Sequence, residues 1–157
     1  MGQFDGKVVY ITGIARGQGR NHAIRFAREG AAIVGLDIAG PIIDHATYPA
    51  ATADDLAETI RLVEGVGGKI LVRQGDTRDL AFQQQLVADA VEQFGRLDHV
   101  VANAGVTKDT LLMRMTDEEF DQAEADGIPD DRLVVHQQDI QAVANALWLA
   151  GAEAMTL

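Results

Sequence analysis

Cysteine and serine are both absent from this chain of 157 residues. Without cysteine there are no disulfides, thiolate metal ligands or thiol nucleophiles, a composition typical of a reducing compartment. Because serine is also missing, the neighbouring Asp44 and His45 have no serine hydroxyl to activate. His22, His45, His99 and His136 form no pair at metal-ligand helical spacing, so we predict no metal site.

Basic residues are scarce, with 13 Lys and Arg against 24 Asp and Glu and a net charge of -11. Clustered Lys and Arg give proteins their affinity for phosphate backbones, so this composition argues against a nucleic-acid partner. No apolar run approaches the roughly 18 residues that span a bilayer. The first residues also lack the apolar core of a signal peptide, so we expect a cytoplasmic protein without membrane contact.

Four short apolar runs, typical of strands buried on both faces, alternate with amphipathic stretches. The runs are residues 8–11, 32–36, 70–72 and 97–102. Strands separated by helices imply right-handed βαβ units, so we predict an α/β fold: a shortened Rossmann-type parallel sheet, ordered 3-2-1-4, with helices on both faces. Residues 1–157 are expected to form one domain, with 1–105 as its cofactor-binding half and 106–157 as a truncated remainder.

Apolar residues at helical spacing predict three helices between these runs. Each is expected to end at a glycine: the first is closed by Gly30, Gly65 lies past the end of the second, and Gly95 stops the third. Thr52 and Asp55 stand in capping-box register before the second helix, and Asp79 is placed to cap the third. Weaker patterns predict a helix at 116–125, a strand at 133–135 and a helix at 139–150.

A glycine-rich turn, Thr12-Gly13-Ile14-Ala15-Arg16-Gly17-Gln18-Gly19, follows the first predicted strand. Glycines let the backbone approach a pyrophosphate closely, and the amides at the start of the next helix favour its negative charge. We therefore predict that Gly13, Arg16, Gly17, Gln18 and Gly19 bind a dinucleotide. The spacing G-x-x-x-G-x-G differs from the commonest dinucleotide fingerprint and from the ATPase phosphate loop, so a turn without a ligand is the alternative.

A carboxylate, Asp37, ends the second predicted strand, and we predict that Asp37 and the next residue, Ile38, bind the cofactor. A carboxylate in this position accepts hydrogen bonds from the adenosine ribose and repels a 2'-phosphate, which favours NAD over NADP. Arg16 is a cation that could instead meet a 2'-phosphate, so the preference for NAD depends on Asp37. A solvated turn residue is the alternative interpretation of Asp37.

Two further segments follow the third and fourth strands. Asp76 and Thr77 are placed to reach the adenine amino group, although Asp before a helix is equally an ordinary turn residue. Asn103 can bond the backbone of the neighbouring strand, and Ala104 and Gly105 leave room for a ribose. We include all five among the predicted cofactor-binding residues.

These motifs together resemble the short-chain dehydrogenase/reductase family. The matching residues are Thr12-Gly13-x-x-x-Gly17-x-Gly19, Asp37, Asp76 and Asn103-Ala104-Gly105. Residues 15–20, the loop after Ile38 and residues 55–59 are particularly similar to the mycofactocin-associated, NAD-dependent branch, whereas 107–115 resemble ketoacyl-carrier-protein reductases. The resemblance implies an NAD-dependent oxidoreductase that transfers a hydride between an alcohol and a carbonyl.

The resemblance also implies a catalytic set that this chain lacks. The family uses a serine, a tyrosine as general acid/base and a lysine four residues after that tyrosine. Tyr10 lies inside the first strand, Tyr48 precedes Pro49, and neither is followed by lysine at that distance. General acid–base help contributes typically about 10²–10⁴-fold to the rate, so we predict no catalytic residues and weak or absent turnover.

Three functional hypotheses follow. The first is an NAD-dependent short-chain oxidoreductase by descent that retains NAD binding, and the second is a noncatalytic or engineered dinucleotide-binding or structural module. The third, an S-adenosylmethionine-dependent transferase, is disfavoured by the glycine spacing together with Asn103-Ala104-Gly105. Because shortening uncovers surface, a homo-oligomer is a further expectation.

Overall fold

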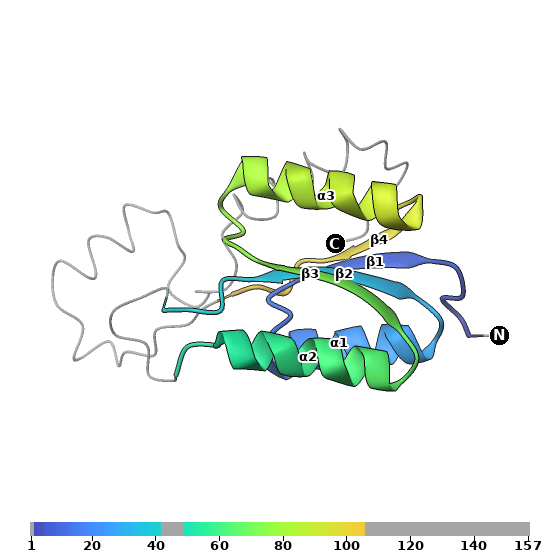
Figure 1. Cartoon of the computed structure of the whole chain (residues 1–157), viewed down its shortest axis with the longest axis horizontal. Coiled ribbons are helices and arrows are strands. Elements are labelled where there is room, and N and C mark those ends of the chain that lie inside the picture. The colour runs from blue at the N-terminus through green and yellow to red at the C-terminus, as the bar shows by residue number, and fades with distance from the viewer. Residues whose placement is uncertain (1, 42–48, 106–157) are drawn as a thin grey trace, which may run out of the picture.

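A computed structural model describes residues 2–41 and 49–105 of the chain (Figure 1). Its elements are β1 (Val8–Thr12), α1 (Gly17–Arg28), β2 (Ala32–Asp37), α2 (Ala53–Gly65), β3 (Lys69–Gln74), α3 (Leu80–Phe94) and β4 (His99–Val101). This alternation confirms the seven elements predicted up to residue 105. The helices and strand predicted at 116–125, 133–135 and 139–150 lie outside the described residues.

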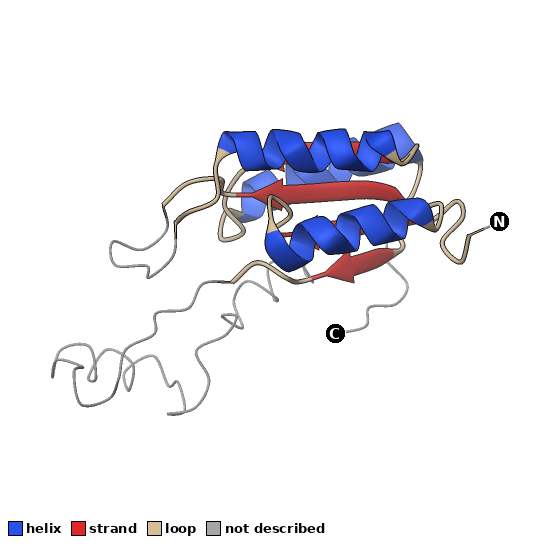
Figure 2. Cartoon of the chain, turned by 90° about the horizontal axis from the view of Figure 1, so that it is seen from below, coloured by secondary structure: helices blue, strands red, loops and turns tan. Residues whose placement is uncertain are grey.

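The four strands form one parallel sheet in the order β3-β2-β1-β4, as predicted. In register, Val9 lies opposite Ile33 on one side and His99 on the other. α3 covers one face of the sheet, and α1 and α2 cover the other (Figure 1). Figure 2 shows α1 and α2 side by side on their face. The α/β, Rossmann-type class with helices on both faces is therefore confirmed.

The core has two layers because successive strand residues point to opposite faces. Tyr10 of β1 and Leu36 of β2 pack toward α3 with Leu86, whereas Ile11 and Ile33 pack in the other layer, with α1 and α2. All five residues of β1 are buried, as expected for a strand covered on both faces.

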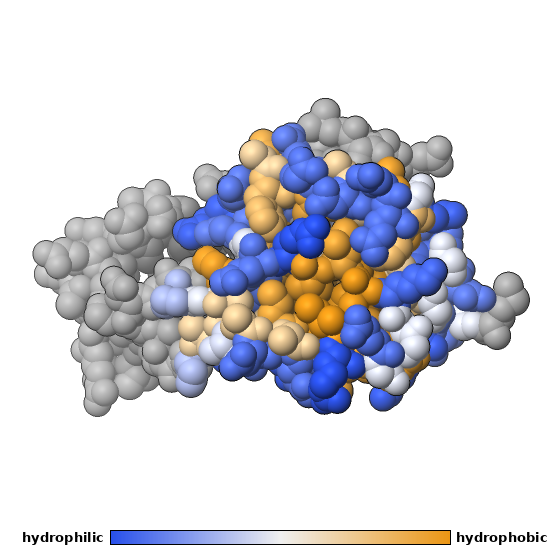
Figure 3. All heavy atoms as spheres, viewed as in Figure 1, coloured by the Kyte–Doolittle hydropathy of each residue, from blue (hydrophilic) through white to orange (hydrophobic). Residues whose placement is uncertain are grey.

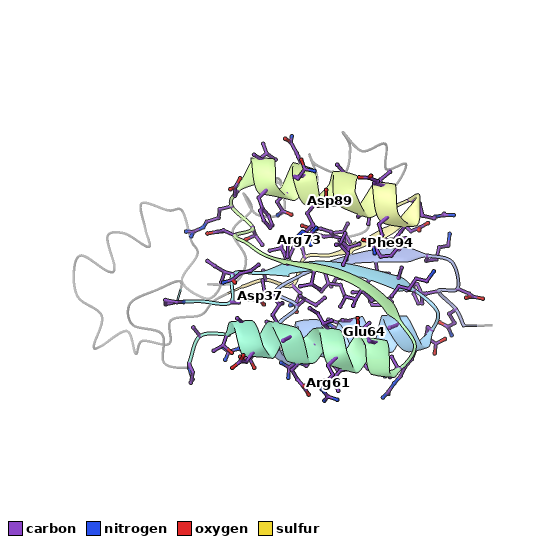
Figure 4. The ribbon with its side chains drawn as sticks, viewed as in Figure 1. Asp37, Arg61, Glu64, Arg73, Asp89 and Phe94 are labelled. Atoms are coloured by element: carbon purple, nitrogen blue, oxygen red, sulfur yellow. The ribbon has the colours of Figure 1, made fainter. Side chains whose placement is uncertain are left out.

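β3 is an edge strand of the described sheet, since it pairs with β2 alone. Apolar side chains gather along this edge, between α2 and α3 (Figure 3). Charges flank them: Lys69 is exposed at the start of β3, and Arg73 forms an ion pair with Asp89 of α3 at 3.5 Å (Figure 4). Such charges make an edge strand a poorer template for pairing with another chain.

The helix ends largely follow the sequence signals. Thr52 and Asp55 form the predicted capping box, and Asp79 accepts the Phe82 amide at 3.0 Å at the start of α3. Gly30 and Gly95 both adopt positive φ after their helices, as a glycine at this position permits.

The predicted end of α2 was wrong by a short distance. Gly65 is the last residue of the helix rather than the residue beyond it. The left-handed residue is Gly67, with φ of 81°, and its amide donates to the Glu64 carbonyl at 2.8 Å. The Gly68 amide donates to the Val63 carbonyl at 3.0 Å, so Gly67, rather than Gly65, is the glycine that terminates the helix.

β4 is shorter than the predicted 97–102. At its start the Asp98 carboxylate accepts the Val8 amide at 2.9 Å, and at its end the Asn103 side-chain amide donates to the Thr12 carbonyl at 3.0 Å. Side chains therefore occupy hydrogen-bond positions that would extend the backbone ladder. The pairing with β1 is confined to His99–Val101.

Candidate functional site

The residues predicted to bind a cofactor follow the carboxyl ends of the four parallel strands, which lie at one edge of the sheet. Contacts join the four ends in turn. Gly13 lies against Asn103, the Ala15 amide donates to the Asp37 carboxylate at 2.9 Å, and the Gly75 amide donates to the Asp37 carbonyl at 2.9 Å. The structure thus brings the separate segments of the sequence to one place.

Three glycines shape the turn after β1, each for a different reason. Gly13 has φ of 68°, and a Cβ there would stand 2.8 Å from the Ala104 Cα. A Cβ on Gly19 would stand 2.0 Å from the Gly13 carbonyl oxygen, so the start of α1 packs directly on the turn. Gly17 has φ of 56° and open space around its missing Cβ. The first two glycines permit close packing, and the third leaves the backbone approachable.

The positive end of the α1 helix dipole is not neutralised by a capping side chain or by an acidic residue in the first turn. Arg16 occupies the N-cap in an extended conformation and caps no amide with its side chain, and the first turn contains no acidic residue. Gly17 and Gln18 are exposed. The partial positive charge of a helix N-terminus favours an anion, so this turn suits a phosphate group. The Arg16 guanidinium itself turns to the Pro49 carbonyl.

Asp37 ends β2 at the same edge, where Figure 4 places it, with only 8% of its surface exposed. One carboxylate oxygen accepts the Ala15 amide and the other accepts the Ala39 amide, both at 2.9 Å. Each oxygen has a second lone pair, so the carboxylate retains capacity to accept a ribose hydroxyl. Ile38 continues the chain, and its carbonyl accepts the Gln74 side-chain amide at 3.0 Å.

Asp76 and Thr77 adopt the turn role that the sequence left open. Asp76 accepts the Arg78 backbone amide at 2.8 Å and also takes the Arg78 guanidinium, at 2.6 Å in the shortest contact. The hydrogen bond from Arg78 holds the pKa of Asp76 below its usual value, against the opposing effect of burial. Thr77 offers its carbonyl to Gln83 at 3.1 Å. Contact of either residue with adenine stays a prediction.

Asn103 bonds the backbone of the neighbouring strand, as expected. Its side-chain amide donates to the carbonyls of Thr12 and Gly13 at 3.0 and 3.1 Å. The Thr12 hydroxyl in turn accepts the amides of Asn103 and Ala104, both at 3.0 Å. Gly105 is exposed beside them. These bonds fix the separation of the β1 and β4 ends.

Sequence reasoning missed three residues that shape the site. Thr12 belongs to the glycine-rich motif but not to the predicted cofactor-binding residues, and Arg20 and Thr59 are also outside that predicted set. Thr12 is signalled by its position as the last residue of a strand, with its hydroxyl at the ligand edge. Arg20 and Thr59 are signalled as polar residues on the otherwise apolar inner sides of two helices, but their meeting requires the tertiary fold.

Neither Tyr10 nor Lys7 is placed at the ligand edge, where the acid/base group that is missing from the sequence would act. Tyr10 is fully buried and donates its hydroxyl to Gln83, and burial raises the pKa of Tyr10 far above its usual range. Lys7 pairs with Asp98 at 3.3 Å, before β1 and thus at the opposite edge of the sheet. Over residues 2–41 and 49–105, no group of three His, Asp or Glu side chains could hold a metal ion. Among those same residues no helix is both long and apolar enough to cross a bilayer.

The fold and the glycine turn define a Rossmann-type nucleotide-binding unit. Residues 7–125 match the family described as short chain dehydrogenase, and the chain belongs to that family. Residues 96–157 additionally match a family of bacterial proteins of unknown function, over less than half of the chain.

Known relatives agree with this assignment. An uncharacterized NAD-dependent oxidoreductase of Mycobacterium tuberculosis is 56% identical over 120 residues, which are 76% of this chain and 44% of the relative. Carveol dehydrogenase from Mycobacterium avium, solved in complex with NAD, is 39% identical with a TM-score of 0.74, over 96% of this chain and 53% of that one. A short chain dehydrogenase from Mycobacterium paratuberculosis, solved bound to NAD, is 40% identical with a TM-score of 0.76, over 96% of this chain and 54% of that one. The chain therefore spans about half the length of the relatives that it matches.

Proposed function

We propose that this chain binds NAD through the turn after β1 and the carboxylate that ends β2. The observation that carries the proposal is the meeting of these two features: the Ala15 amide inside the turn donates to Asp37. Gly17 leaves open space beside the uncapped start of α1, which fits a pyrophosphate, and Asp37 fits a ribose diol. The NAD named for two structural relatives supports the same cofactor.

Bound NAD would supply a hydride acceptor for an alcohol, the chemistry of the family's oxidoreductases. The residues of this chain would hold the cofactor, but the sequence contains neither serine nor Tyr-x-x-x-Lys to exchange the substrate proton. We therefore propose that the chain on its own binds NAD and oxidises secondary alcohols only at background rate. Robust reduction of saturating NAD by the purified chain would contradict the second half of this proposal.

Calorimetric titration with NAD, NADP and S-adenosylmethionine tests the binding. We expect NAD to bind more tightly than NADP because the Asp37 carboxylate repels a 2'-phosphate. Asp37→Asn removes that charge and one hydrogen-bond acceptor. It should therefore weaken NAD binding about tenfold, a loss typical of one charged hydrogen bond, and reduce the preference for NAD over NADP. Glu64→Gln is the matched control, since it removes the same charge from an exposed position near the end of α2.

The outcomes separate the candidate functions. Absence of NAD binding at millimolar concentration, or equal affinity for NADP, would refute the NAD site. Tight S-adenosylmethionine binding would instead favour the transferase hypothesis. NAD binding without turnover is the expected result, and it is compatible with a noncatalytic dinucleotide-binding module.

The assembly and cellular location are further proposals. We propose that the chain self-associates through surface that a longer member of the family would cover, which light scattering of the purified chain would test. The acidic composition supports the absence of a nucleic-acid partner. The cytoplasmic location predicted from the sequence is tested by cell fractionation.

A further inference from the structure

The peptide units of Ala15, in the middle of the glycine turn, are held on both sides. The amide of Ala15 donates to Asp37 at 2.9 Å. The carbonyl of Ala15 accepts the Thr59 hydroxyl at 2.8 Å and the Arg20 Nε at 3.0 Å. Ala15 is itself fully buried, so these bonds are shielded from water. The backbone of Ala15 thus has three side-chain partners, which are Asp37, Thr59 and Arg20.

Arg20 reaches this carbonyl from the first turns of α1 and joins it to α2. Its Nε donates to the Thr59 hydroxyl at 2.9 Å, and its terminal nitrogen donates to the Asp55 carbonyl at 2.8 Å. The Arg20 side chain is only 23% exposed. Hydrogen bonds from Thr52 hold the pKa of the Asp55 carboxyl below its usual value, so a negative charge stands 3.4 Å from the Arg20 guanidinium.

Thr59 completes the contact from α2. It is fully buried, and its hydroxyl lies 2.8 Å from the Ala15 carbonyl and 3.1 Å from the Ile14 carbonyl. A hydroxyl has one hydrogen to donate and two lone pairs that accept. Because Arg20 donates to the Thr59 oxygen, the hydroxyl hydrogen is free to point toward the carbonyls around it, including those of the glycine turn.

We propose that Arg20 and Thr59 are positioning residues that fix the Ala15 carbonyl and thereby aim the glycine turn at its ligand. The inference deepens the proposed NAD site and rests on it. Rotation of the peptide that follows Ala15 would turn the Arg16 amide and redirect the start of α1. Movement of Ala15 would also release Asp37. One short segment therefore links the amides that face the pyrophosphate to the carboxylate that faces the ribose.

Substitutions at Thr59 and Arg20 separate positioning from charge. Thr59→Val keeps the shape of the side chain but removes the hydroxyl, and we expect about tenfold weaker NAD binding, the loss typical of one buried hydrogen bond. Thr59→Ser restores the hydroxyl and should bind NAD nearly as the parent chain does. Arg20→Lys keeps the charge but loses the planar fork, and it should also weaken binding about tenfold.

Arg61→Lys is the matched control for Arg20→Lys, since it makes the same exchange at an exposed position of α2. Arg61 pairs with Glu58 at 2.6 Å, its side chain is 68% exposed, and it points away from the sheet (Figure 4). We expect this Arg61 variant to bind NAD with an affinity less than about twofold different from that of the parent chain, because an exposed ion pair contributes little energy. Circular dichroism of each variant at the titration temperature establishes that the protein measured is folded.

Amide hydrogen exchange of Ala15 in the ligand-free chain provides a readout that needs no NAD. Exchange should be about tenfold faster in Thr59→Val and Arg20→Lys than in the parent chain and near the parent rate in Thr59→Ser. Unchanged NAD affinity or unchanged exchange in folded Thr59→Val and Arg20→Lys overturns the positioning role. If the parent chain binds no NAD, the proposed function fails, while the exchange rates still decide whether these residues hold the turn.

Discussion

Replacing Gly13 with alanine tests the close contact between the ends of β1 and β4. The backbone at Gly13 has φ of 68°, a conformation that costs a residue with a Cβ about 1–2 kcal/mol. The new Cβ would also stand 2.8 Å from the Ala104 Cα and 3.0 Å from the Asn103 side-chain nitrogen. Overpacking of this kind typically costs about 1–3 kcal/mol, because the backbone on the other side must move. We expect Gly13→Ala to lower the free energy of unfolding by about 2–5 kcal/mol.

Gly17→Ala separates these two contributions. Gly17 has φ of 56°, but a Cβ there would meet no atom within 4 Å, so only the conformational cost of about 1–2 kcal/mol applies. The difference between the two variants, about 1–3 kcal/mol, isolates the contact with β4. Gly65→Ala is a control that should raise the free energy of unfolding. Gly65 is the last residue of α2, a Cβ there would meet no neighbouring atom, and alanine favours the helix over glycine by up to about 1 kcal/mol.

Urea unfolding followed by far-ultraviolet circular dichroism measures these free energies, and an unchanged dependence on urea concentration in each variant establishes that the same transition is compared. Equal destabilisation by Gly13→Ala and Gly17→Ala would show that the ends of β1 and β4 do not constrain one another. The geometry of the turn described above would then be refuted.

Three further variants test the site and its support. Gly17→Ala should weaken NAD by at least about tenfold in calorimetry despite its modest effect on stability, since the methyl group occupies the space left for the phosphate; parent-like affinity would place the phosphate elsewhere. Tyr10→Phe leaves the Gln83 oxygen buried without its donor and should lower the free energy of unfolding by about 1–3 kcal/mol, with Gln83→Leu in the same chain recovering part of the loss in urea unfolding. Burial raises the pKa of Asp98, but hydrogen bonds from Arg96, the Val8 amide and Lys7 lower this pKa overall. The ionised Asp98 therefore stabilises the folded chain above the unfolded pKa of about 3.9, and this stabilisation is lost as pH falls through the lower folded pKa. The stability gap between Asp98→Asn and the parent chain should therefore shrink between pH 6 and about pH 3, and a constant gap would contradict this reasoning.

The elements up to residue 105 could be predicted because their determinants are local. Strand β1 contains the uninterrupted apolar run 8–11, the Thr52–Asp55 box marks the start of α2, and Asp79 and Gly95 bracket α3. The parallel order followed from the alternation of strands and helices. The end of α2 was less predictable because Gly65 and Gly67 are both able to end a helix, and only the backbone shows that Gly67 takes the left-handed conformation.

The binding edge was only partly predictable for a different reason. The glycines and Asp37 carry local signals of backbone conformation and charge. Thr59 carries no such signal, because it lies 44 residues from Ala15 along the chain and meets it only when α2 packs beside α1. For Asp76 the sequence left two roles open: the structure shows the turn role through the contacts with Arg78, and contact with adenine stays a prediction.

The proposed binding edge is held in place by contacts from three different elements of the fold. Three hydrogen bonds hold the turn after β1. Asn103, after β4, donates to the Gly13 carbonyl; Thr59 of α2 donates to the Ala15 carbonyl; and Asp37 of β2 accepts the Ala15 amide. None of these contacts involves a serine or a Tyr-x-x-x-Lys, the groups that the family resemblance implies for proton exchange with an alcohol. The contacts that hold this edge thus lie within residues 2–41 and 49–105, whereas the serine and the Tyr-x-x-x-Lys implied by the family resemblance are absent from the sequence.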